Sequence, residues 1–360
     1  MFSPTSSSPP KQMIFDGFIL PAKYILGRAT KFFLLFSLAF CPAFRIAYQS
    51  IYGISHCNYT TKLSIFECVY TTVSVIVLSA KILLALFSFN LDYYKKYVSN
   101  IELLSIETNT SAARAIKRNL GLNLIIHVIP FIGYIILSLF YMFSYYQDIP
   151  RSVIILLIIS EFFIEFGVLF LLNMICNTCI YLRAAFNQVN SQIATLNGTS
   201  NQSFNHLFDE IRNLRKSYSY AVRSTRNAEK FFRFFITLFY IKYFSYNIIN
   251  IVQSFGPQTK IDLIFLVPIL IQTVQLIILT YNLVSVNNLS RQGLEDLYEF
   301  SFKLNSLHLY HENDIFMARM ALSDVGFTFA NLFTINNSFI TSLFTLSLTI
   351  ILALASFIYH

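Results

Sequence analysis

Hydroxyl side chains recur along the last apolar segment of the chain, at Ser338, Ser342, Thr345, Thr349 and Ser356. Their intervals of four, three, four and seven residues keep them on one face of a helix. Such a stripe on an otherwise apolar helix has two explanations. The hydroxyl groups pack against another membrane helix, where Ser and Thr are common, or they line a file of water.

Glu161 and Glu165 lie one helical turn apart inside another strongly apolar segment. Ionisable groups at such a depth are costly in hydrocarbon and usually face protein or water. Arg45, Lys81 and Lys242 also fall inside apolar segments and are the expected partners. The carboxylates therefore either form buried ion pairs that fix helix packing or face a water-filled ligand cavity.

Tyr, Asn and Gln residues gather in one half of several apolar segments, and aromatic walls with a few amide groups suit a small organic ligand. Tyrosine belts at the membrane surface explain part of the same pattern. With the two glutamates, the residues that we predict to line a ligand pocket are Tyr70, Tyr141, Glu161, Glu165, Tyr243, Tyr246, Asn247, Gln272 and Gln275.

No catalytic set stands out, so we do not expect an enzyme. His127 is the only histidine well inside an apolar segment, and no Ser, Cys or carboxylate stands at a characteristic spacing from it. Cys176 and Cys179 form a C-x-x-C pair without a second pair or nearby His ligands, which argues against zinc or redox chemistry. We predict neither a metal nor a cofactor.

The composition indicates a membrane protein: 55% of residues are hydrophobic, 12% are charged and the mean hydropathy is +0.58. A soluble domain carries roughly 25% charged residues. Runs of about 20 apolar residues, each able to cross a hydrocarbon layer of about 30 Å, predict an all-α protein with seven transmembrane helices. The runs are 32–52, 65–89, 122–146, 153–177, 231–255, 263–286 and 337–359.

The cations are divided unequally between the two sides of these runs. Twenty of the 26 Lys and Arg residues lie on one side: they precede the first run, follow runs two, four and six or, in the case of Arg233, stand at the start of run five. The three opposite connections hold only Lys62, Arg151 and Lys260. The positive-inside rule then predicts a cytoplasmic N-terminus and an extracellular C-terminus. The distribution also accounts for the net charge of +8 without a nucleic-acid partner.

Two features at the outer face are left open by the sequence. Cys57 and Cys68 lie close enough in sequence to form a bridge there. Asn58-Tyr59-Thr60 is a sequon between them, and whether Asn58 is glycosylated is left open because two membrane spans are so near.

The predicted organisation has four parts. Residues 1–31 form a cytoplasmic N-terminus, 32–286 a six-helix ligand-binding bundle with cytoplasmic extensions, 287–336 a cytoplasmic helix and linker, and 337–360 the seventh helix. Because no Gly or Pro stands between Gly167 and Gly198, we expect the fourth helix to continue into the cytosol. The stretches 204–233 and 297–330 have helical spacing and form either an assembly layer or ordinary loop helices.

The C-terminal region resembles insect gustatory receptors. Phe327-Thr328-Phe329-Ala330-Asn331-Leu332-Phe333-Thr334-Ile335-Asn336 is similar to the family's F-T-A-C-G-F-F-T-L-D stretch, and 300–304 is similar to F-S-L-Q-L. The family's hallmark in the last span is T-Y, five mostly apolar residues, then Q-F, and ten residues separate its Thr from the preceding hexapeptide. Residues 339–348 are these ten in this chain. Thr349 and Phe357 match the ends of this hallmark, while Ile350 replaces Tyr and Ser356 replaces Gln.

The resemblance implies a tastant-gated, non-selective cation channel in the plasma membrane of gustatory sensory neurons. Four subunits, alike or mixed, would surround one pore formed by the seventh helices. The residues implied as pore-lining are Ser338, Ser342, Thr345, Thr349, Ser356 and Phe357, with Ser356 and Phe357 at a narrow outer gate. The expected partners are a small-molecule tastant, cations, the lipid bilayer and other receptor subunits.

An odorant receptor of the same superfamily is the nearest alternative, distinguished mainly by the hallmark in the last helix. A G-protein-coupled receptor also has seven spans, but it needs an external N-terminus, against the charge distribution. Sugars, bitter compounds, carbon dioxide and internal nutrients all remain open as ligands.

Overall fold

The computed structural model describes residues 28–52, 62–106, 110–145, 150–198, 204–254, 263–322 and 324–359. Within these ranges the chain is almost entirely helical, which confirms the all-α prediction. One two-stranded antiparallel hairpin is the exception. In chain order the elements are α2 (Arg28–Leu35), η1 (Phe36–Phe40), α3 (Cys41–Tyr52), α4 (Lys62–Phe87), α5 (Leu91–Glu102), α6 (Thr110–Tyr145), α7 (Arg151–Gly198), α8 (Phe204–Ser254), α9 (Leu263–Leu289), α10 (Leu294–Ser301), α11 (Leu307–Ala321), β1 (Thr328–Phe329), β2 (Phe333–Thr334) and α12 (Asn337–Tyr359).

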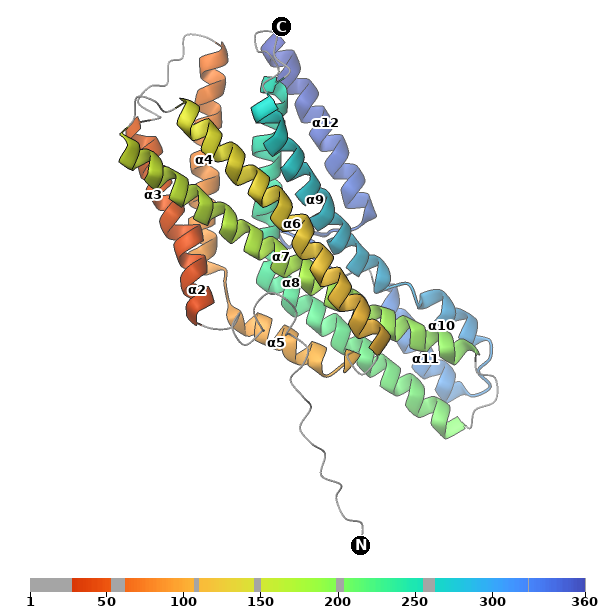
Figure 1. Cartoon of the computed structure of the whole chain (residues 1–360). Helices are drawn as coiled ribbons and strands as arrows, with labels where there is room; N and C mark the ends of the chain where they lie inside the picture. Colours follow the sequence, from red (N-terminus) through yellow and green to blue (C-terminus); the bar gives the residue numbers. More distant parts are fainter. Residues whose placement is uncertain are drawn as a thin grey trace.

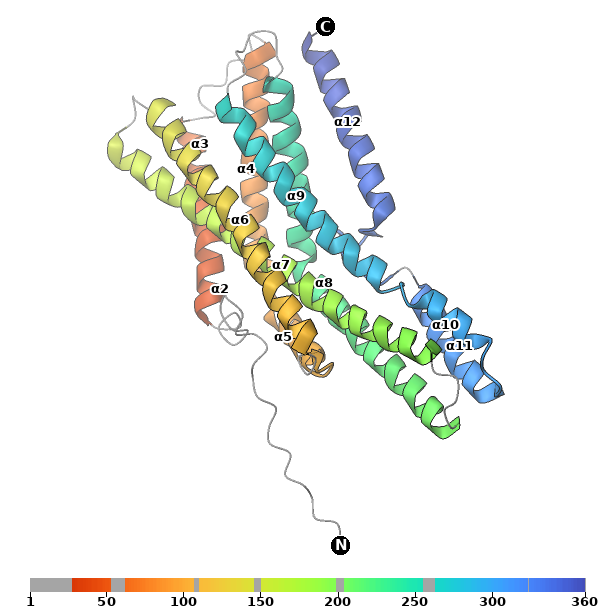
Figure 2. The same cartoon turned by 45° about the vertical axis from the view of Figure 1, so that its right-hand side comes forward.

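The long helices form an elongated bundle, and α12 stands at its edge (Figures 1 and 2). α7 and α8 extend far beyond the others toward the end where α10 and α11 lie. The continuation of α7 to Gly198 was predicted from the absence of Gly and Pro after Gly167, and the structure confirms it. α8 joins the predicted cytoplasmic stretch and the predicted fifth span in one helix of 51 residues.

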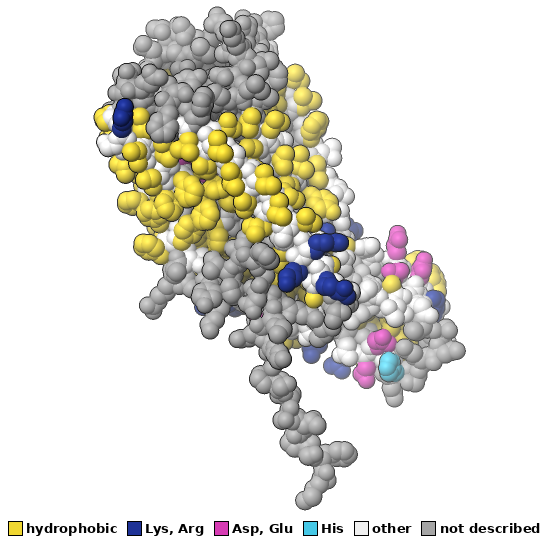
Figure 3. All heavy atoms as spheres, in the orientation of Figure 1, with side chains coloured by type: hydrophobic (Ala, Val, Ile, Leu, Met, Phe, Trp, Pro, Cys, Tyr) yellow, Lys and Arg dark blue, Asp and Glu magenta, His cyan; other side chains and the backbone are white. Residues whose placement is uncertain are grey.

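Apolar side chains cover the described part of the bundle on the face that Figure 3 shows, and most of the charged side chains on that face lie beyond the lower edge of this apolar region. Exposed residues such as Phe32, Leu83 and Ile129 belong to this apolar surface, which suits contact with lipid. Four helices in the described ranges are long and apolar enough to cross a membrane, or five if the pair bent by 67° between α4 and α5 counts as one span. A helix stands at each of the seven predicted runs, but the number of spans and their orientation stay predictions.

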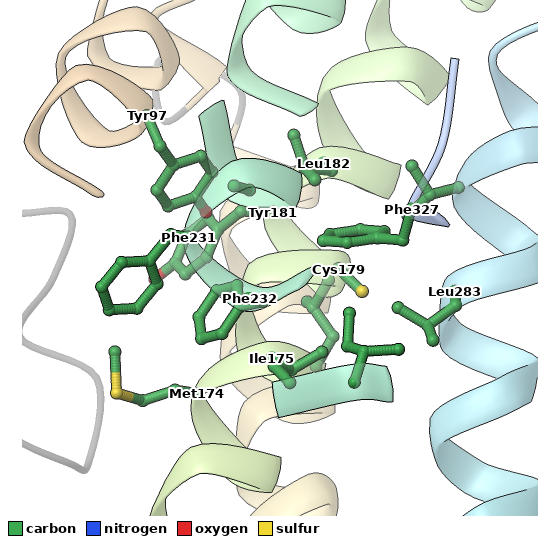
Figure 4. Close-up of a cluster of buried hydrophobic side chains, with 14 of the residues drawn as sticks. Tyr97, Met174, Ile175, Cys179, Tyr181, Leu182, Phe231, Phe232, Leu283 and Phe327 are labelled. Atoms are coloured by element: carbon green, nitrogen blue, oxygen red, sulfur yellow. The ribbon is translucent and has the colours of Figure 1, made fainter. Parts of the chain in front are cut away.

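The core lies where α5, α7, α8 and α9 meet (Figure 4). Tyr97, Cys179, Phe232, Leu283 and Phe327 are all buried there, each from a different segment of the chain. Phe327 belongs to the segment just before the hairpin. The start of the last helix is therefore tied to the centre of the protein.

The first membrane-length helix contains a π-helical turn. In η1 the backbone N–H of Cys41 donates to the carbonyl of Phe36, five residues back. Pro42 follows directly, and it has no N–H to give the carbonyl four residues earlier. The π turn accommodates this proline without ending the helix. Gly167 of α7 lies against this π-helical turn, so close that an added Cβ would stand 2.5 Å from Ser37 Oγ.

The region 297–330, predicted as one helical stretch, is not a single helix. α10 ends at Ser301, α11 occupies Leu307–Ala321, and the hairpin follows. Ala330 and Asn331 have φ values of 50° and 62°, so the chain turns there in the left-handed region that tight hairpins need. α10 packs against α7, and α11 packs against α8.

The close contact of Gly167 with Ser37 yields a stability prediction. Gly167→Ala should lower the melting temperature of the detergent-solubilised protein, because overpacking at a tight contact costs about 1–3 kcal/mol. Ser37→Gly in the same chain should recover most of the loss. Gly121→Ala is the matched control, since its Cβ would meet nothing within 4 Å. Equal melting temperatures for the two alanine variants would contradict the prediction.

Candidate functional site

Glu161 on α7 is held by two neighbouring helices. Its carboxylate accepts a hydrogen bond from the Arg45 guanidinium of α3 and another, at 2.9 Å, from the Tyr134 hydroxyl of α6. The pairing of Glu161 with one of the embedded cations was predicted, and it is confirmed. Tyr134 was not predicted. It stands in the middle of a span, away from the interfacial belts where Tyr is common, and this position is the signal that could have identified it.

Glu165, one turn further along α7, is shared by two lysines. Its Oε1 atom lies 3.0 Å from Lys242 Nζ on α8 and 3.9 Å from Lys81 Nζ on α4. The side chains of Lys81 and Glu165 are only 6% and 16% exposed. The five embedded charged residues thus form two neighbouring groups, Arg45 with Glu161 and both lysines with Glu165. Of the two alternatives that the sequence left open, the ion pairs are present. Because a buried ion is not hydrated, each of these charged side chains depends on its oppositely charged partner.

A small cavity opens beside this network. Its volume is about 20 Å³, enough for about one water molecule. The polar part of the wall is Glu165, Tyr134, Gln272 and Gln275, and the apolar part is Phe131, Val168, Leu169 and Ile271. Glu165, Gln272 and Gln275 were predicted for a pocket; Tyr134 and the four apolar residues were not.

Of the remaining predicted pocket residues, the three whose side chains the structure describes, Glu161, Tyr243 and Asn247, do not line this cavity. Tyr243 is half-buried against the main core. Asn247 is buried, and in the part of the chain that the structure describes neither atom of its amide has a hydrogen-bond partner. The side chains of Tyr70, Tyr141 and Tyr246 lie outside the described residues.

The hydroxyl stripe of α12 faces away from the rest of the chain. Its five members, Ser338, Ser342, Thr345, Thr349 and Ser356, are all exposed. The other side of α12 meets the bundle: Phe339 is 8% exposed, and Leu343 and Ile350 are half-buried.

Among the described residues the stripe therefore does not pack against another helix of the same chain. Thr341 is exposed as well, and its carbonyl accepts a hydrogen bond from Thr345 Oγ1 at 3.0 Å. The Phe357 side chain lies outside the described residues.

The hairpin before α12 is fastened to α8 by polar contacts. Glu229 accepts two hydrogen bonds from Arg233, at 2.6 and 2.8 Å, and one from the Thr328 hydroxyl. About two turns further along α8 than Glu229, Thr237 Oγ1 accepts from the backbone N–H of Ala330 at 2.9 Å. These contacts fix the first strand and the turn of the hairpin relative to α8.

Aromatic side chains hold the first turn of α12. Phe339 lies 5.3 Å, between ring centroids, from Tyr240 of α8, edge to face. The hairpin adds Phe329 and Phe333 to the same group. Asn336 Oδ1 accepts from the N–H of Phe339 at 3.0 Å and caps the helix. The base of α12 is therefore rigidly placed, while the face with the hydroxyl groups has no partner within the described chain.

A second polar link stands just before the hairpin. Asp324 accepts from Arg226 of α8 at 2.5 Å and from Arg319 of α11 at 3.3 Å. Burial by itself raises the pKa of Asp324, but the two guanidinium groups outweigh it and hold the pKa below its ordinary value. Asn287 at the end of α9 donates to the Val325 carbonyl at 2.7 Å. The segment 324–334 is thus connected to α8, α9 and α11.

The cysteines fall into two groups. Cys68 is disulfide-bonded, and Cys41, Cys176 and Cys179 are free thiols. The predicted bridge partner, Cys57, and the sequon at Asn58 lie outside the described residues. Cys176 Sγ is 3.9 Å from His127 Nε2 in the buried interior. In the ranges that the structure describes, no three His, Cys, Asp or Glu residues gather as metal ligands would.

The fold is similar to that of an insect chemoreceptor. The structure of the olfactory receptor OR5 from Machilis hrabei matches with a TM-score of 0.61 and 12% identity, over 91% of this chain and 87% of that one. The structure of the same receptor in complex with eugenol matches with a TM-score of 0.60 and 13% identity, over 93% and 98%. No protein-family model and no curated protein matches the sequence. At these identities the likeness establishes the fold.

The ion network predicts a large effect at Glu165. Glu165→Gln leaves Lys81 and Lys242 without a counter-charge in the membrane interior, and removing one partner of a buried pair costs about 3–5 kcal/mol. We expect a lower melting temperature in detergent and less protein at the cell surface.

Two further variants make the test specific. Lys81→Met added to Glu165→Gln restores the balance of charges and should recover folding. Asp92→Asn breaks only an exposed pair with Lys95 and should change neither measurement. A Glu165→Gln protein as stable as the wild type would contradict the structural role of the network.

Proposed function

We propose that this chain is a subunit of a ligand-gated cation channel of the insect chemoreceptor type, and more specifically a gustatory receptor. Four α12 helices surround the pore. The supporting observation is the direction of the hydroxyl stripe, which points away from its own bundle along the whole of α12. A membrane helix with one polar face turned outward needs a polar environment there, and a central water-filled pore supplies it.

The hydrogen bonds within α12 favour the passage of cations through the proposed pore. Thr345 and Thr349 donate their hydroxyl hydrogens to carbonyls of the preceding turn, at 3.0 and 2.9 Å. Their oxygen lone pairs are then left for the pore. Weak oxygen acceptors along a wide path stabilise passing cations without holding them, as non-selective conduction requires. At the outer end Ser356 and Phe357 form the gate, with Phe357 as the hydrophobic plug.

Ligand binding is coupled to the pore through α8 and α9. Lys242 of α8 belongs to the network beside the cavity, and Tyr240, two residues away, contacts Phe339 at the base of α12. α9 supplies Gln272 and Gln275 to the cavity wall and reaches the hairpin segment through Asn287. A ligand that binds an enlarged cavity better than the closed one shifts the population toward conformations in which α9 has moved against α8.

The subtype follows from the resemblance in the last 60 residues. Thr349 and Phe357 stand at the ends of the gustatory hallmark, so a tastant is the first candidate ligand and the plasma membrane of gustatory neurons the expected location. The alternative is an odorant receptor, which the similarity to the fold of OR5 supports. Water-soluble tastants and volatile odorants, applied to cells that express the chain, distinguish the two by calcium imaging.

The pore assignment predicts a loss of conduction without a loss of assembly. Thr345→Leu with Thr349→Leu turns two oxygen rings of the pore into apolar rings, which opposes wetting. We expect currents under voltage clamp to fall at least tenfold while the amount of tetramer at the surface stays unchanged.

Ser347→Ala serves as the control, because Ser347 bonds to the Leu343 carbonyl on the other face of α12. It removes a hydroxyl group from the same helix without touching the stripe. Normal currents from the double leucine variant would remove the pore assignment.

A further inference from the structure

The first turns of α6 carry three basic side chains and no acidic one. Arg114, Lys117 and Arg118 are all exposed, and the 36 residues of α6 include neither Asp nor Glu. In the part of the chain that the structure describes, Lys117 and Arg118 have no ion-pair partner. The positive end of the helix dipole lies at the same end of α6, where cations are unfavourable and anions are stabilised. This end of α6 therefore attracts an anion.

The rotation of α6 about its axis is fixed by the side that packs on the bundle. The buried residues in its first half are Ile116, Leu120, Asn123 and His127. Their spacing of four, three and four residues places them on one face of the helix. Arg114 and Arg118 stand on the opposite face, one turn apart, and Lys117 lies beside them. The three cations therefore point away from the bundle.

The face with the two arginines continues along α6 as a strip of exposed apolar side chains. Its members, each at least half exposed, are Leu122, Ile125, Ile129, Ile132 and Ile136. They follow Arg118 at intervals of four, three, four, three and four residues, so the cations and the apolar strip share one face. Among the four candidate spans in the described ranges, the one in α6 is the least buried, at 17% against 33% or more. The strip suits contact with lipid chains.

The depth of the cations follows from the direction in which α6 crosses the membrane. The charge distribution predicts that α6 enters from the cytosol. Its first turns then lie at the level of the lipid headgroups of the inner leaflet. Side chains on a helix lean toward its N-terminus, so the three cations lean out of the hydrocarbon and into the headgroup layer.

A glycine leaves room between the cations and the apolar strip. A Cβ added at Gly121 would meet nothing within 4 Å. Gly121 follows Lys117 by four residues and Arg118 by three, so it lies next to both of them on the membrane side. Because no side chain covers this point, a lipid headgroup can approach the helix backbone between the basic side chains and the apolar strip.

We propose that this face of α6 binds a phosphoinositide of the inner leaflet. The phosphate groups lie against Arg114, Lys117 and Arg118, and an acyl chain lies along the apolar strip. Arginine binds phosphate oxygens in a bidentate manner, and lysine binds them as a point charge. Lipid binding at this face is independent of the channel proposal and requires only that α6 crosses the membrane from the cytosolic side.

The number of cations selects the headgroup. A phosphate monoester carries a charge of about −1.5 to −2 at pH 7, so an inositol ring with two of them can offset all three cations. Phosphatidylserine brings a net charge of only about −1. One phosphoinositide therefore neutralises a cluster that would otherwise need several molecules of phosphatidylserine.

The test counts bound lipids by native mass spectrometry of the purified full chain in detergent. Phosphatidylinositol bisphosphate, phosphatidylserine and phosphatidylcholine compete at equal concentration, and inositol trisphosphate serves as the free headgroup. The bisphosphate lipid should bind with roughly tenfold or greater preference over phosphatidylserine, since each cation at a membrane surface contributes about a fivefold factor. The free headgroup should bind more weakly than the lipid, because it makes no contact with the apolar strip.

Matched variants locate the binding site. The neutral variant replaces the three cations of α6: Arg114→Gln, Lys117→Gln and Arg118→Gln. It should lower the affinity for the bisphosphate lipid at least roughly tenfold. The control variant removes the same charge from three exposed positions on the extension of α8: Arg212→Gln, Lys216→Gln and Arg223→Gln. It should leave the lipid preference unchanged.

Gly121→Leu tests the site without a change of charge. The new side chain fills the open space beside Lys117 and Arg118 and should lower the affinity for the bisphosphate lipid severalfold. This variant alone decides the outcome where the neutral variant does not reach the membrane.

Three results would overturn the proposal: equal binding of the bisphosphate lipid and phosphatidylserine, an equal loss in the α8 control, or an unchanged preference in Gly121→Leu and in the neutral variant. Loss of the assembled tetramer in the neutral variant with lipid binding retained would also overturn it, and would assign this face to a contact between subunits.

Discussion

The shared carboxylate of Glu165 is the interaction on which the arrangement of the bundle depends. In hydrocarbon a lysine cannot exchange its partner for water, so Lys81 and Lys242 fix α4 and α8 to the same point of α7. Glu161 adds α3 and α6 through Arg45 and Tyr134. Five helices are thereby held at one level of the membrane by polar contacts, whereas the apolar contacts between them can slide. α9 reaches this level only through neutral side chains of the cavity wall.

The motif that prompted the resemblance to gustatory receptors has a structural explanation. Its glycine position falls on Asn331, which has a φ of 62° and is one of the residue types that tolerate the left-handed region. Its final aspartate position falls on Asn336, which caps α12. Its first Thr, Thr328, contacts Glu229 of α8. In this chain the motif therefore forms a hairpin that places the last helix against α8.

Much of this could be predicted from the sequence, because the membrane removes alternatives. Apolar runs of sufficient length must be helices, and the embedded charges had to find one another. The end of α7 at Gly198 followed from the lack of helix breakers. The sequence could not indicate how each helix is rotated about its axis or which side chains lie close to one another. The spacing in α12 defines a polar face but not its direction, and nothing in a linear pattern assigns Tyr134 to Glu161 or reveals that Asn247 lies off the cavity. The break between α10 and α11 was missed because residues 302–306 carry no Gly or Pro to mark it.

The size of the cavity and the position of the charged side chains together indicate which wall of the cavity moves when it enlarges. Ligand sites of drug-like size have volumes of about 300–1,000 Å³, so a cavity of about 20 Å³ would have to enlarge in order to serve as the proposed ligand site. Enlarging it on the side of α4 and α8 would stretch the ion pairs of Glu165 in a medium where that costs several kcal/mol. Enlarging it on the side of α6 and α9 separates Phe131, Ile271, Gln272 and Gln275 from α7, and these are neutral contacts. α9 is also the helix whose inner end holds the segment before the hairpin, through Asn287. The least costly expansion of the cavity is therefore the one that moves the base of α12.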